Sequence, residues 1–153
     1  MSALKDQLHS DLTASMKARD ALRTSTLRMV LTAITNAEVS GKQVRELTDD
    51  DIITVLGAEA KKRREAAQAF ADGDRPELAK KETEEAAILA EYLPAQFSHD
   101  EIVAIVSAAV ESAGAAGEGM KAMGKVMGIV SPQVKGKADG GVVAAEVKRQ
   151  LGA

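Results

Sequence analysis

The sequence predicts an all-α protein, with an N-terminal four-helix bundle followed by a small three-helix domain. Apolar residues recur every three or four positions through most of the 153 residues, which is the period of an amphipathic helix. Ser, Thr or Asp precedes several of these segments, and these residues favour the start of a helix. No segment alternates apolar and polar residues convincingly, so we expect no sheet.

The first two helices are predicted from apolar spacing. Leu4, Leu8 and Leu12 recur every four residues after Ser2, a candidate N-cap. A second helix is predicted over residues 20–39, where an apolar stripe lies on one side of the helix. The stretch SGKQ follows and predicts a loop.

The next two helices are predicted from their capping residues. Thr48 precedes three aspartates, which are favourable at the N-terminal end of a helix dipole, so a third helix should reach about Ala71. Pro76 suits the first turn of a fourth helix that runs to about Leu93, before Pro94. The break at residues 93–98 predicts a domain boundary.

Three further helices are predicted in the C-terminal part. Ser98 and Glu101 have the spacing of a capping box ahead of an apolar run. A helix over residues 120–130 should end before Pro132, which with Ser131 would begin one more helical turn closed by a glycine. The last helix is predicted over residues 139–151.

The composition excludes several chemistries. The chain has no cysteine, so disulfides, thiol nucleophiles and thiolate metal sites are excluded. Two isolated histidines, His9 and His99, support metal ligation poorly, and we expect no cofactor and no metal. No window approaches the ~20 apolar residues of a membrane span, and no apolar leader follows the start. We expect a cytoplasmic protein with no membrane partner.

Charge is distributed unevenly along the chain. The formal net charge is −3, yet the segment from Glu118 onward has six basic and three acidic residues, which leaves −6 for the remainder. We therefore expect an acidic bundle over residues 1–94 and a basic three-helix domain over residues 95–153. Only three residues are aromatic, so nucleic-acid binding here would depend on charge and shape rather than base stacking.

The stretch GMKAMGKV, residues 119–126, resembles a phosphate-binding loop. It has the two glycines and Lys125 at the required spacing. Val126 replaces the hydroxyl residue that binds magnesium, however, and no strand precedes the stretch. The sequence therefore argues against nucleotide hydrolysis.

A helix explains this stretch better. Met123, Val126 and Val130 gather on one side, while glycines and lysines gather on another. Each glycine in a helix costs ~1 kcal/mol relative to alanine, which indicates that something approaches this face closely. Either a neighbouring helix packs on the glycines, or an RNA backbone docks there. The candidate RNA-binding residues are Lys121, Gly124, Lys125, Gly128, Lys135, Lys137, Lys148 and Arg149.

The motif MGKVMGIVSPQVKGKADGG, residues 123–141, resembles the C-terminal signature of the GatB/YqeY family. Residues 22–39, 47–70 and 84–98 also resemble that family in order and spacing. The resemblance covers essentially the whole chain and implies an all-helical protein in two parts. The motif matches include Gly124, Lys125, Gly136, Lys137, Asp139 and Gly140, for which the resemblance implies no catalytic role.

The resemblance also implies a functional setting. The C-terminal module is shared with the tail of the B subunit of the glutamine-dependent aminoacyl-tRNA amidotransferase, where it is associated with tRNA contact. Stand-alone members carry the label of carbon–nitrogen ligase with glutamine as amido-N-donor. We find no nucleophile with a base and no metal–phosphate site in the sequence, so we assign no catalytic residue.

Several charges are predicted on apolar sides of helices, where they need partners because an unpaired buried ion costs several kcal/mol. Interhelical ion pairs explain them better than an acid–base or metal site, since the Glu-x-x-His spacing of di-iron bundles is missing. The run KKRR is spread around a helix, with Arg63 turned inward. The structural ion-pair candidates are Arg23, Glu38, Glu59, Arg63, Glu82 and Glu85.

Three hypotheses remain for the function. The first is a tRNA-binding or tRNA-handling accessory protein, with possible partners among the amidotransferase or aminoacyl-tRNA synthetase components. The second is a contribution to glutamine-dependent amidation in which other subunits supply the nucleophile and the ATP site. The third is a helical protein–protein interaction module without RNA binding, whose glycine face receives another helix.

Overall fold

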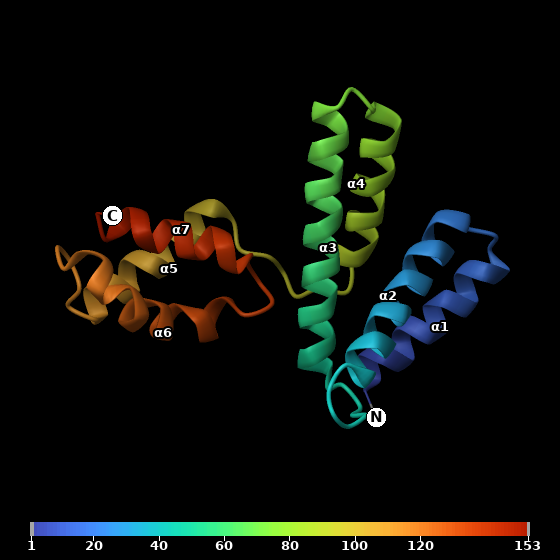
Figure 1. Ribbon diagram of the computed structural model, residues 1–153, viewed down its shortest axis with the longest axis horizontal. Coiled ribbons are helices and arrows are strands. Elements are labelled where there is room, and N and C mark those ends of the chain that lie inside the picture. Colours follow the sequence, from blue (N-terminus) through green and yellow to red (C-terminus); the bar gives the residue numbers. More distant parts are fainter. Residues whose placement is uncertain (1, 153) are drawn as a thin grey trace. The chain divides into compact units, whose positions relative to one another are not determined.

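The computed structural model describes residues 2–152. Over those residues it contains seven α-helices, one short 3₁₀-helix and no strand, which confirms the all-α fold class (Figure 1). The chain divides into two compact units, Met1–Leu93 and Pro94–Ala153, and each is described by itself. The helix labels below follow Figure 1.

Helices α1 (Ala3–Lys17) and α2 (Ala21–Val39) form an antiparallel hairpin. The Ser2 side chain accepts a hydrogen bond from the Lys5 amide, and the Asp20 side chain accepts one from the Arg23 amide. Both caps satisfy backbone donors that have no partner within the helix. The connection between the helices is short because Arg19 adopts a left-handed conformation with φ of 57°.

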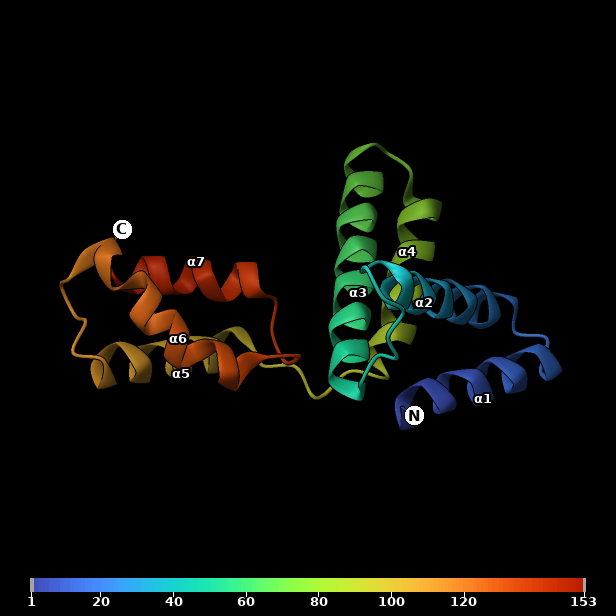
Figure 2. The ribbon, with the colours of Figure 1, turned by 60° about the horizontal axis from the view of Figure 1, so that its bottom comes forward.

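A second hairpin is formed by α3 (Asp49–Asp72) and α4 (Pro76–Ala90), which lie side by side and antiparallel in both views (Figures 1 and 2). Thr48 and Asp51 form a capping box at the start of α3. Helix α4 ends at Ala90 instead of Leu93. The next three amides bind carbonyls three residues back, a tighter turn that suits the restricted backbone before Pro94.

All four helices contribute to the core of this unit. Leu8, Leu27, Ile34, Leu56 and Leu89 are fully buried and belong to one hydrophobic cluster. The cluster draws on the early part of α3 and the last turn of α4, so α1 and α2 pack against that end of the α3–α4 hairpin.

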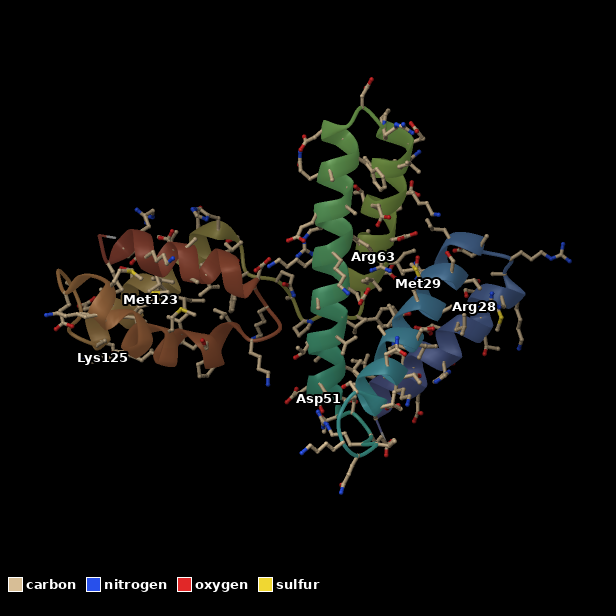
Figure 3. The ribbon with its side chains drawn as sticks, in the orientation of Figure 1. Arg28, Met29, Asp51, Arg63, Met123 and Lys125 are labelled. Carbon is tan, nitrogen blue, oxygen red and sulfur yellow. The ribbon has the colours of Figure 1, made fainter. Side chains whose placement is uncertain are left out.

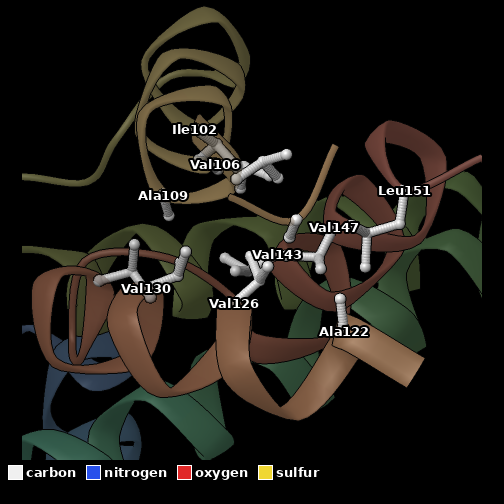
Figure 4. Packing of buried hydrophobic residues seen from close by; sticks show 12 residues of the cluster. Ile102, Val106, Ala109, Ala122, Val126, Val130, Val143, Val147 and Leu151 are labelled. Atoms are coloured by element: carbon white, nitrogen blue, oxygen red, sulfur yellow. The ribbon is translucent and has the colours of Figure 1, made fainter. Parts of the chain in front are cut away.

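The second unit contains α5 (His99–Ser112), the 3₁₀-helix η1 (Gly119–Ala122), α6 (Met123–Val134) and α7 (Gly140–Gln150). Ser98 and Glu101 form the capping box of α5, and the Asp139 side chain caps α7 by accepting from the Gly141 amide. Figure 4 shows how valines of α6 and α7 meet Val106 of α5 in the core.

The prediction that a helix ends before Pro132 is wrong. Helix α6 is continuous from Met123 to Val134 and contains this proline. Proline so near the end of a helix removes one intrahelical hydrogen bond, whereas continuing the helix buries Val134 beneath Val126 and Val130, at i+8 and i+4 spacing. The burial of Val134 outweighs the lost hydrogen bond.

The start of this helix also differs from the prediction. Residues 119–122 form a 3₁₀ turn, and the α-helix begins only at Met123. Because a 3₁₀-helix has about three residues per turn, its side chains point in other directions than they would in an α-helix. Met120 is 47% exposed, whereas Ala122 is buried.

Candidate nucleic-acid interface

The side of α6 opposite the core is polar and exposed along its whole length. Val126, Val130 and Val134 face the core, so residues half a turn away face outward. Lys125 and Met123 are labelled in Figure 3, the first exposed and the second half-buried against the core. We give the name outer face of α6 to seven exposed residues. Five lie on the helix itself, Gly124, Lys125, Gly128, Ser131 and Pro132, while Lys121 lies in the 3₁₀-helix before it and Lys135 directly follows its end.

The two glycines of the outer face have no structural neighbour. A Cβ atom added to Gly124 or Gly128 would meet nothing within 4 Å. The explanation in which another helix of this unit packs on the glycines is therefore wrong. Each glycine still costs ~1 kcal/mol in helix stability relative to alanine, and no contact within the unit offsets that cost.

Lys135 and Lys137 flank Gly136 in the loop between α6 and α7. Gly136 has φ of 74°, a conformation that favours glycine. The Lys137 ammonium lies 5.5 Å from the centre of the Phe97 ring, within the range of a cation–π interaction. The Lys137 carbonyl also accepts a hydrogen bond of 2.8 Å from the Phe97 amide. Lys135 is exposed on the outer face, whereas Lys137 already has an aromatic contact.

The two basic candidates on α7 differ from each other. Lys148 is exposed, but the Arg149 guanidinium binds both carboxylate oxygens of Glu146, with an Nη2 to Oε1 distance of 2.6 Å. The hydrogen bonds from Arg149, and then that from Gln150, lower the pKa of Glu146 to about 2. The structure does not show Lys148 or Arg149 in contact with the outer face of α6.

The net charge of the C-terminal unit differs from the basic surplus that we expect for residues 95–153. Six basic residues are balanced by six acidic ones, because Asp100, Glu101 and Glu111 of α5 offset the lysines of the later segment. The expectation of a basic domain is wrong for the unit as a whole. The basic surplus is confined to the segment from Glu118 onward, which includes the outer face of α6.

In the N-terminal unit, a buried ion cluster links α3 and α4. Arg63 is 8% exposed, and its guanidinium lies 2.8 Å from Glu59 and 3.3 Å from the buried Glu85. Burial raises the pKa of Glu59, but the hydrogen bonds from Arg63 and Lys62 outweigh it and lower the pKa overall. Arg63 also contacts Met29 of α2, beside it in Figure 3.

The other ion-pair candidates have different surroundings. Arg23 of α2 binds Glu91 at 2.6 Å, which lowers the pKa of that carboxyl group. Lys5 of α1 binds Glu38 at 2.8 Å and lowers its pKa through this hydrogen bond. Glu82 is half-buried, and Arg63 contacts Glu85 instead of it.

Comparison with known proteins places this arrangement in a family. The family model described as "Yqey-like protein" matches residues 5–151. The chain belongs to the YqeY-like family. That assignment agrees with the resemblance in the C-terminal motif, most of which lies on α6 and the loop after it.

Three fungal relatives of this YqeY-like chain are informative. An uncharacterised protein of Schizosaccharomyces pombe is 35% identical over 96 residues, which cover 63% of the chain and 76% of the relative. "Altered inheritance of mitochondria protein 41, mitochondrial" of Clavispora lusitaniae is 32% identical over 60% of the chain and 52% of its own length. The protein of the same name from Pyrenophora tritici-repentis is 26% identical over 96% of this chain and 80% of its own length.

The names of two relatives concern mitochondria, whereas we expect this YqeY-like protein in the cytoplasm, and that location stays a prediction. In residues 2–152, each helix is too short or too polar to span a bilayer.

Two contacts of the YqeY-like fold escaped the sequence analysis. The phenol of Tyr92 donates a 2.6 Å hydrogen bond to Asp11, and burial followed by this bond raises the pKa of Tyr92. Glu146 was also missed, although it lies three residues after Val143 and three before Arg149, on the apolar stripe of α7. A carboxylate at that spacing from a buried valine and an arginine is the signal that could have revealed it.

Proposed function

We propose that this YqeY-like protein is a tRNA-binding accessory protein whose outer face of α6 contacts the phosphate backbone. The observation that carries the proposal is the pair Gly124 and Gly128, which are exposed, without neighbours and flanked by Lys121 and Lys125. A helix with two interior glycines that contact no neighbour is less stable than the same helix with alanines at those two positions. A polyanion that approaches the helix closely would explain both glycines, because neither has a side chain that would hold the polyanion away.

The chemistry of the outer face favours the RNA backbone over the bases. Lysine side chains neutralise phosphates without reading sequence. None of the three aromatic residues, Phe70, Tyr92 and Phe97, belongs to the outer face, and the Phe97 ring already contacts the Lys137 ammonium. The face therefore suits a structured, duplex-rich RNA such as tRNA, recognised by charge and shape.

The family relationship supports tRNA as the RNA concerned. The C-terminal motif resembles the amidotransferase tail that is associated with tRNA contact. In this proposal, the N-terminal unit, with 14 basic and 17 acidic residues, faces a protein partner, such as an amidotransferase or aminoacyl-tRNA synthetase component. Any carbon–nitrogen ligase chemistry with glutamine as donor would then come from the partner.

The test measures binding of bulk tRNA to the full-length protein at several salt concentrations. Replacing Lys121 and Lys125 with alanine should weaken binding and reduce the slope of log K against log salt by about 2, which is about 1 for each phosphate that is no longer neutralised. The control variant replaces Lys80 and Lys81 on α4, which are also exposed, and removes the same charge. Equal binding by both variants would refute the assignment to α6.

A partner helix is the second candidate for the outer face. Gly124 and Gly128 are four residues apart and exposed, a spacing at which two helices can approach closely. If the wild-type protein binds tRNA weakly and without salt dependence, the helix-binding function is favoured. A protein partner that copurifies with the wild type, and is lost when both glycines are replaced by alanine, would support it directly.

A further inference from the structure

The guanidinium of Arg63 is buried, yet its hydrogen-bond donors are served unequally. Arg63 is 8% exposed, and its Nη1 donates to the carbonyl of Glu59 at 3.0 Å and to the Glu59 carboxylate at 2.8 Å. Nε lies 3.3 Å from a Glu85 oxygen but has no hydrogen-bond partner among residues 2–152. Nη2 donates to the sulfur of Met29 at 3.5 Å, and a thioether is a weak acceptor. The Met29 side of this buried cation is therefore poorly satisfied.

Met29 connects the buried cation with solvent. It lies on α2, beside Arg63 of α3 (Figure 3), and is 40% exposed. A small oxidant dissolved in water therefore reaches this residue without any opening of the core. Oxidation converts the thioether of methionine into a polar sulfoxide, whose oxygen is a better hydrogen-bond acceptor than the sulfur. Oxidised Met29 would thus supply an acceptor on the side where Arg63 has a weak one.

Met16, on α1, has different surroundings. Its sulfur accepts a hydrogen bond of 3.2 Å from Nη2 of Arg28, and Met16 is 42% exposed. Arg28 is exposed, so water already serves its guanidinium and a new acceptor would add little. At Met29, in contrast, an accessible side chain meets a guanidinium that is shielded from water.

Hydrogen peroxide is an oxidant that suits this step. The sulfur lone pair attacks one peroxide oxygen, and the O–O bond breaks. The sulfur loses an electron pair and keeps that oxygen, while the peroxide is reduced. The second oxygen takes up the proton of the first and leaves as water. The product is methionine sulfoxide, which methionine sulfoxide reductases convert back to methionine.

We infer that Met29 is a methionine oxidation site whose sulfoxide oxygen is bound by Nη2 of Arg63, so that peroxide strengthens the contact between α2 and α3. A sulfoxide usually disrupts apolar packing. Here the oxygen faces a charged donor, and hydrogen bonds to charged groups are stronger than neutral ones. Met29 is also partly exposed, so its polar form needs little desolvation. The inference is independent of RNA binding.

The experiment uses the full-length protein with Met16→Leu, which removes the other methionine of the α1–α2 hairpin. After peroxide treatment, peptide mass spectrometry measures oxidation at Met29 and at Met120, a reference residue in the C-terminal unit that is 47% exposed. Oxidation of Met29 should slow hydrogen exchange of the α2 amides about fivefold, as expected for one net hydrogen bond. Methionine sulfoxide reductases should reverse the effect.

Two control variants are made in the same background. Met29→Leu should show no peroxide response in α2. Arg63→Met with Glu85→Leu removes the guanidinium and the carboxylate that it would leave unpaired, so oxidation of Met29 should no longer slow exchange. Slowing that persists in this double variant would overturn the inference. Faster or unchanged exchange in the oxidised Met16→Leu protein would overturn it whether or not the double variant folds, as would a Met29 that stays unoxidised when Met120 is fully oxidised.

Discussion

Pro132 lies four residues after Gly128 in one uninterrupted helix, so its ring takes the place of the donor that the Gly128 carbonyl would otherwise have. Replacing this proline with alanine should add one backbone hydrogen bond and remove the clash of the ring. Because the site is near the helix end, we expect the free energy of opening α6 to rise by about 1–3 kcal/mol. Hydrogen exchange of the α6 amides measures this change, and faster exchange would contradict it.

Alanine at Gly124 and Gly128 should separate stability from binding. A Cβ at either site meets nothing within 4 Å, so the double variant should stabilise α6 by about 2 kcal/mol in total. The same two methyl groups would hold an RNA backbone away from the helix. We expect slower hydrogen exchange in α6 together with weaker tRNA binding at unchanged charge. Unchanged binding by this more stable variant would show that close approach is not needed.

The ion cluster of α3 and α4 should destabilise the protein when only one partner of a buried pair is removed. Replacing Arg63 with methionine leaves Glu85 buried without its partner and should destabilise the N-terminal unit by about 3–5 kcal/mol. Adding Glu85→Leu removes the stranded carboxylate and should recover most of that loss, because a buried ion pair can often be replaced by apolar residues. Denaturant unfolding of the two variants measures both steps. Failure of the second change to restore stability would indicate that Glu59 carries the cost.

Acid should weaken the C-terminal unit through Glu146. Its pKa is about 2 in the folded protein, against about 4.3 for an unperturbed glutamate. Because the folded pKa is the lower one, the contribution to stability is present above about pH 4.3 and is lost as the pH falls toward 2. Glu146→Gln should reduce the pH dependence of α7 hydrogen exchange in that range. A variant with the same acid response as the wild type would contradict this.

Local signals in the sequence were sufficient for much of the fold. Ser98 and Glu101 form their capping box because its hydrogen bonds join residues only three apart. The position of Pro132 inside a continuous helix was not predictable in this way, because it depended on the burial of Val134 against α5 and α7. The choice between Glu82 and Glu85 as the partner of Arg63 likewise required the packing of α3 on α4.

Part of the candidate interface could also be predicted from local spacing in the sequence. The helical period placed Gly124 and Lys125 on one side of α6, and both are exposed. The contact between Lys137 and Phe97 joins residues 40 positions apart, which local spacing does not determine. Whether the exposed lysines bind RNA stays a prediction that the salt-dependent assay decides.

The segment before α5 determines where the C-terminal unit can be cut from the rest of the chain. Phe97 donates its amide to Lys137, and the Gln96 side chain donates to the Gly136 carbonyl at 2.8 Å. A fragment begun at the α5 cap, Ser98, would lose both anchors of the loop that carries Lys135 and Lys137. An expression fragment should therefore start at Pro94, so that the loop keeps the shape it has in the intact protein.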